Sequence, residues 1–110
     1  MGLCDKKCVP CEGRTPPITA EKIAELLPSV PGWTLTFGML HREMKLKNFK
    51  EAVDLFNKIA DLAEENGHHP DLTIYRWNKL KIVFYTHAIN GLSENDFIMA
   101  AKVNRLVDTV

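Results

Sequence analysis

The sequence predicts an α+β fold, a four-stranded antiparallel sheet with three helices packed on one face. Hydrophobic spacing switches between the helical period and the two-residue period of strands, and the segments follow the order helix, hairpin, helix, hairpin, helix. Two hairpins supply four antiparallel strands, and helices with one apolar side bury a face of such a sheet. The 110 residues match the length of one domain.

The first helix and the first hairpin fall in the first half of the chain. Thr19 can cap a short helix, because apolar residues follow at helical spacing before Pro28 ends it. A strand over 33–37, a turn at Gly38 and a strand over 39–47 then form the hairpin.

The middle helix has the clearest pattern. Asn48 can cap it, and Asn66-Gly67 is a typical C-terminal signal. Its apolar positions keep the spacing of one helix face, and they are Phe49, Ala52, Val53, Phe56, Ile59, Ala60 and Ala63.

The second hairpin is expected over 71–75 and 79–87, around Trp77-Asn78. Its second strand carries apolar residues on both faces, which indicates a central strand or one covered by a partner chain. Ser93 to Asp96 resembles a capping box with Asp in place of Glu, and it precedes an apolar helix over 97–107.

Residues 1–18 are expected to form an irregular arm before a domain over 19–110. The arm holds all three cysteines, Cys4, Cys8 and Cys11, and this odd number argues against a disulfide framework. Reduced thiols are the preferred interpretation. A zinc site completed by a distant histidine is the alternative.

Composition limits the classes of partner. Fourteen basic residues balance fourteen acidic ones, so no charge excess favours direct contact with nucleic acid or with an anionic membrane. The chain has neither an apolar run of about 18 residues, as a membrane span requires, nor the apolar stretch of a secretory signal. A cytoplasmic protein is therefore expected.

Three of the four histidines are expected to meet where a helix end lies near a strand end. His68 and His69 close the middle helix before Pro70, and His87 ends the last strand. Glu64 precedes His68 by four residues, so it can hydrogen-bond to that ring. Imidazole titrates near neutrality, so one ring can accept a proton while another donates one to a hydroxyl leaving group.

Structural interpretations of these residues remain open at this point. Taken singly, His68 is typical of a helix end or a surface, His87 of a strand end, and Glu64 of a solvated helix face. These three could also form an open zinc site, although the spacing of a metalloprotease helix is missing. His41 lies on the first hairpin and is expected at the surface.

Four segments, in their order and spacing, resemble the pterin-4a-carbinolamine dehydratase family. They are Gly67-His68-His69-Pro70-Asp71, Trp77-Asn78-Lys79, Thr86-His87 and Gly91-Leu92-Ser93-Glu94-Asn95-Asp96-Phe97. The resemblance covers about residues 17–110. One departure is an extra residue between His69 and Thr86, which we place in the turn over 75–79.

The resemblance implies an enzyme without metal or cofactor that removes water from 4a-hydroxytetrahydropterin, such as 4a-hydroxytetrahydrobiopterin, in tetrahydrobiopterin recycling. It implies that His68 and His87 are the general acid and base. The residues that it implies for substrate binding are His69, Pro70, Glu64, Thr86 and Asp96. For Asp96, a capping role is an equal alternative.

The resemblance also implies a homodimer or homotetramer. The alternative function is that of a non-catalytic interaction, assembly or transcriptional coactivator protein on the same fold. A complete histidine trio favours the enzyme, because a scaffold has no need to keep three imidazoles together.

Overall fold

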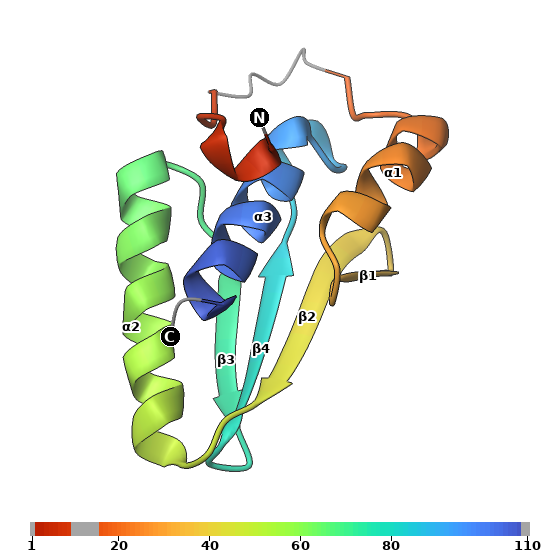
Figure 1. The fold of residues 1–110 in the computed structure, drawn as a ribbon. Helices are drawn as coiled ribbons and strands as arrows, with labels where there is room; N and C mark the ends of the chain where they lie inside the picture. The colour runs from red at the N-terminus through yellow and green to blue at the C-terminus, as the bar shows by residue number, and fades with distance from the viewer. Residues whose placement is uncertain (1, 10–15, 109–110) are drawn as a thin grey trace.

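A computed structural model describes residues 2–9 and 16–108 and has the expected order of elements (Figure 1). The helices and strands are α1 (Ala20–Leu26), β1 (Thr34–Thr36), β2 (Met39–Lys45), α2 (Phe49–Asn66), β3 (Asp71–Tyr75), β4 (Lys79–Phe84) and α3 (Glu94–Asp108). Short 3-10 helices are η1 (Leu3–Asp5), η2 (Leu27–Ser29) and η3 (His87–Ile89). The predicted α+β class is confirmed.

The four strands form one antiparallel sheet in the order β1-β2-β4-β3. The strand with apolar residues on both faces, β4, lies between β2 and β3, so the prediction of a central strand is confirmed. Leu40 of β2 pairs with Phe84, and Leu72 of β3 pairs with Ile82. These residues therefore share the face that α2 and α3 cover (Figure 1).

The core lies between this sheet face and the helices. Its largest fully buried side chains are Phe84, Phe97, Leu40, Ile59, Leu80, Ile82 and Met99. Arg42 interrupts the apolar row of β2, and its guanidinium donates to the amide oxygen of Asn104 in α3. The Trp33 indole donates to the same oxygen at 2.8 Å, so a polar link ties the sheet to α3 at the edge of the core.

Capping interactions are found at both ends of α2. The Asn48 side chain accepts a hydrogen bond from the backbone N–H of Glu51 at 2.9 Å, as expected. At the other end Gly67 has φ 68°, and its N–H donates to the Ala63 carbonyl at 2.9 Å. The left-handed Gly67 turns the chain out of the helix axis, so His68 does not continue the helix.

Two predicted boundaries are wrong by three residues. The last strand ends at Phe84 instead of His87, because Thr86 and Gly91 exchange backbone hydrogen bonds of 3.1 and 3.4 Å that close a tight loop. Asn90, with φ 51°, completes this loop, and His87 lies in η3 within it. The last helix begins at Glu94, three residues before the expected start.

Within the described part of the chain, every helix is too short or too polar to traverse a lipid bilayer.

Asn48→Ala tests the assignment of the α2 cap. Loss of the side-chain acceptor leaves the Glu51 N–H without its partner, so the free energy of unfolding should fall by about 1 kcal/mol. Urea denaturation followed by circular dichroism measures the change. Asn57→Ala on the exposed side of α2 is the matched control and should change stability far less. Equal losses in both variants would contradict the cap.

Candidate active site

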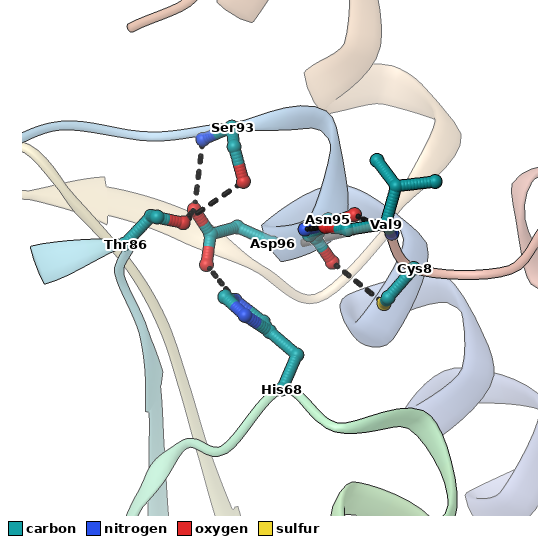
Figure 2. Close-up of polar contacts among 7 residues, drawn as sticks. All are labelled: Cys8, Val9, His68, Thr86, Ser93, Asn95 and Asp96. Carbon is teal, nitrogen blue, oxygen red and sulfur yellow. Dashed lines mark hydrogen bonds and ion pairs between the residues drawn. The ribbon is translucent and has the colours of Figure 1, made fainter. Parts of the chain in front are cut away.

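A buried carboxylate lies at the centre of the candidate site (Figure 2). Asp96, in the first turn of α3, is 0% exposed. Its Oδ1 lies 2.6 Å from Nε2 of His68, while its Oδ2 accepts from the Thr86 hydroxyl at 2.8 Å and from the Ser93 backbone N–H at 2.9 Å. One carboxylate thus connects the chain after α2, the chain after β4 and the start of α3.

The hydroxyls beside Asp96 form an ordered relay. Thr86 has one proton and donates it to Asp96, so the Ser93 hydroxyl, 2.8 Å from that of Thr86, donates to Thr86 in turn. The hydrogen bond from the Ser93 N–H to the Asp96 side chain is one half of the expected capping box. The other half is not formed, because the Ser93 hydroxyl bonds to Thr86 instead of to a backbone N–H of the helix. Asp96 therefore combines the capping role with a place in the site.

His68 is held on two sides. Its side chain is 13% exposed, and its ring stacks on Phe84 with centroids 6.0 Å apart and planes inclined by 10°. An ionised carboxylate only accepts hydrogen bonds, so Nε2 carries the proton toward Asp96. In the neutral ring, Nδ1 then holds the lone pair. This arrangement fixes the tautomer and orientation of the ring, as the carboxylate does in hydrolase triads.

The expected bond between Glu64 and His68 is not formed. Glu64 instead pairs with Nε2 of His69 at 2.5 Å, and the two side chains are 76% and 58% exposed. The four-residue spacing argument fails because α2 ends at Asn66 and Gly67 reverses the backbone before His68. The two adjacent histidines therefore point to different carboxylates, one buried and one at the surface.

His87 lies on η3 directly after Thr86, and its ring is exposed. It makes an edge-on contact with Tyr85, with centroids 4.9 Å apart. Thr86 itself is buried and bonded to Asp96, so the loop that carries His87 is attached to the same carboxylate that holds His68. That three imidazoles surround one substrate stays a prediction.

The structure thus brings His68, Thr86 and Asp96 into one hydrogen-bonded cluster. Pro70 is half-buried between His69 and β3, outside this cluster. Ser93 belongs to the cluster and was missed as a site residue, although its place three residues before Asp96 in the capping pattern was a signal.

Metal-binding geometry is absent from residues 2–9 and 16–108, where no group of three or more His, Cys, Asp or Glu side chains could hold an ion. Glu64, His68 and His87, the residues of the zinc alternative, do not form such a group. Cys11, which the alternative cysteine zinc site requires, lies outside the described residues.

Comparison with known proteins gives matches over most of the chain. Residues 16–106 match the family model for pterin 4 alpha carbinolamine dehydratase. The chain is 47% identical over 94% of its length to the mitochondrial pterin-4-alpha-carbinolamine dehydratase 2 of Arabidopsis thaliana, and it spans 58% of that protein. It is 49% identical to a Methylococcus capsulatus protein assigned to the same dehydratase, with 94% of this chain and 92% of the relative covered.

A solved structure supports the same relationship. The crystal structure of a transcriptional coactivator/pterin dehydratase from Brucella melitensis superimposes with a TM-score of 0.76 and 29% identity. The alignment covers 82% of this chain and 97% of the other.

Thr86→Val tests the buried cluster. Valine keeps the shape of threonine but removes the hydroxyl, so Asp96 and Ser93 each lose a hydrogen-bond partner in a buried setting. The free energy of unfolding should fall by about 1–3 kcal/mol. Thr73→Val, on an exposed position of β3, is the matched control and should be nearly neutral. Equal stability of the two variants in urea denaturation would contradict the network.

Proposed function

The chain belongs to the pterin 4 alpha carbinolamine dehydratase family, a family of hydro-lyases, and we propose that it removes water from 4a-hydroxytetrahydropterin to give quinonoid dihydropterin. The observation that carries the proposal is the 2.6 Å contact between the buried Asp96 carboxylate and His68. It supplies an imidazole of fixed tautomer beside a loop that bears a second, exposed imidazole, that of His87.

The reaction requires two proton transfers. A base takes the proton from ring nitrogen N5, and the electron pair of that N–H bond forms a double bond between N5 and C4a. The C4a–O bond breaks, and an acid protonates the departing hydroxyl so that it leaves as water. The pterin ring supplies the electrons for this elimination, so the proposed reaction uses no cofactor.

We assign these transfers to His68 and His87, in an order that depends on which face of the ring carries the hydroxyl. Nδ1 of His68 is the reacting atom, because Nε2 is committed to Asp96. The buried carboxylate stabilises the imidazolium that forms when Nδ1 takes up a proton. Thr86 helps to position both imidazole rings. Its hydroxyl donates to Asp96, which holds His68, and its backbone leads directly into η3, which carries His87.

The exposed pair formed by His69 and Glu64 is assigned to substrate binding, with Pro70 fixing the chain that carries it. At the surface, an imidazole held by a carboxylate presents its second nitrogen to a ligand in a fixed direction. A pterin has several ring nitrogens and a carbonyl oxygen that can take up such a contact. Which pterin is used depends on groups beyond the ring, and biopterin is the substrate we propose.

We also propose that the protein is a cytoplasmic homodimer or homotetramer. The two edge strands β1 and β3 leave backbone groups available for pairing with a second copy. Exposed aromatic residues at the chain turns, Phe37 and Trp77, add apolar surface of the kind that interfaces bury. The Arabidopsis relative is named as a mitochondrial protein, so the cytoplasmic location that we propose for this chain does not rest on that relative.

A second candidate function is that of an interaction protein. The Brucella structure is described as a transcriptional coactivator as well as a pterin dehydratase, which favours this candidate. A purely interacting protein would not depend on His68 or His87, so the variants below separate the two candidates.

Stopped-flow absorbance of synthetic 4a-hydroxytetrahydrobiopterin tests the enzyme. His68→Ala and His87→Ala should each lower kcat roughly a hundredfold or more, because each removes one proton-transfer group. His41→Ala is the matched control, since His41 lies on β2 and has no contact with the Asp96 cluster among the described residues. Wild-type turnover no faster than that of the double histidine variant would refute the dehydratase.

Light scattering coupled to size exclusion tests the assembly. The measured molar mass should be two or four times that of the 12.5 kDa chain. A molar mass equal to that of a single chain, at micromolar concentration, would contradict the proposed oligomer.

A further inference from the structure

The N-terminal residues lie along α3 instead of projecting away from it (Figure 1). Contacts occur at both ends of the helix. Near its start Lys6 Nζ lies 3.5 Å from Glu94, and further along Arg105 lies 3.2 Å from Asp5. The Lys102 ammonium donates to the Cys4 carbonyl at 2.9 Å. Residues 4–9 thus follow the helix that carries Asp96.

Asn95 pairs with the backbone of Val9 in both directions (Figure 2). Asn95 is buried, with 3% of its surface exposed. Its side-chain Oδ1 accepts a hydrogen bond from the Val9 N–H at 3.0 Å, and its side-chain amide N–H donates to the Val9 carbonyl. This two-way pairing copies the bonding of neighbouring strands. The Cys8 thiol adds a contact of 3.9 Å to the Asn95 carbonyl.

A second anchor lies on the other side of Ser93. The Ile18 N–H donates to the Leu92 carbonyl at 3.0 Å. The chain passes so close to Gly91 that a Cβ there would lie 2.6 Å from Cβ of Pro17. N-terminal residues therefore contact the chain just before Ser93 and just after it.

Contacts of this kind stabilise the first turn of a helix. Its N–H groups have no partner within the helix, and helix ends open more readily than helix centres. Asp96 lies in this turn, and its bond from the Ser93 N–H exists only while the turn is formed. Any opening there moves the carboxylate away from His68.

We propose that Asn95 is a positioning residue, which clamps the backbone of Val9 on the first turn of α3 and so keeps Asp96 aligned with His68. The inference rests on the proposed dehydratase function. The inference is supported by the position of Asn95, which is buried and lies next to the buried Asp96 both in the sequence and in space (Figure 2). The clamp also gives residues 4–9 a part in holding the site in place.

Val9→Pro is the sharpest test, because it removes the N–H that Asn95 accepts. The Val9 side chain is 65% exposed, so Val9→Ala, which keeps the N–H, is the matched control. Val9→Pro and Asn95→Ala should each lower kcat roughly tenfold, since small displacements of a reacting group cost rate, and should leave KM within about twofold. The double variant should be no slower than Asn95→Ala alone.

A purely structural role predicts a different pattern, with a lower unfolding midpoint in both variants and wild-type kcat in the folded protein. That pattern, or a loss of rate in Val9→Ala equal to that in Val9→Pro, would overturn the proposal.

Hydrogen exchange supplies a readout that does not need activity. The Ser93 amide should exchange faster in Val9→Pro than in Val9→Ala, while amides in the middle of α2 keep their wild-type rates. Unchanged exchange at Ser93 would overturn the clamp even if kcat fell. If the wild type has no dehydratase activity but the Ser93 amide still exchanges faster in Val9→Pro than in Val9→Ala, the proposed function is refuted and the clamp is retained.

Discussion

The bond between the Asp96 carboxylate and the His68 ring is the constraint on which the rest of the site depends. A carboxylate withdrawn from water is costly unless its lone pairs are used, and here a ring N–H, a hydroxyl and a backbone N–H use them. The whole second hairpin separates His68 from the other two donors, Thr86 and Ser93. The same residues that satisfy the charge therefore also fix how α2, β4 and α3 meet.

The local conformations follow from this requirement. Gly67 in a left-handed conformation directs His68 toward α3 and leaves His69 at the surface with Glu64. The closed loop between Thr86 and Gly91 turns the Thr86 hydroxyl toward Asp96 and places His87 on η3. One imidazole is thus rigid, stacked on Phe84, while the other is exposed. A rigid ring and an exposed ring suit an elimination in which substrate must enter and water must leave.

Much of the fold could be predicted because it depends on local rules. The spacing of apolar residues identified α2, and side-chain capping at Thr19 and Asn48 is found as expected. Pairings between distant residues could not be predicted in this way. The spacing of Glu64 and His68 suggested a bond that the turn at Gly67 prevents, and nothing near His68 in the sequence points to Asp96. The pairing of residues 4–9 with α3 is of this kind, because it includes the match between the side-chain amide of Asn95 and the backbone of Val9.

The tautomer of the His68 ring tests the central claim most directly. Nitrogen-15 chemical shifts of the ring, assigned through the His68→Ala spectrum, distinguish the two nitrogens in the neutral form. The Asp96 contact predicts a proton on Nε2 that exchanges slowly with water, and a lone pair on Nδ1. A neutral ring protonated on Nδ1, or one whose Nε2 proton exchanges as in a free histidine, would contradict the account.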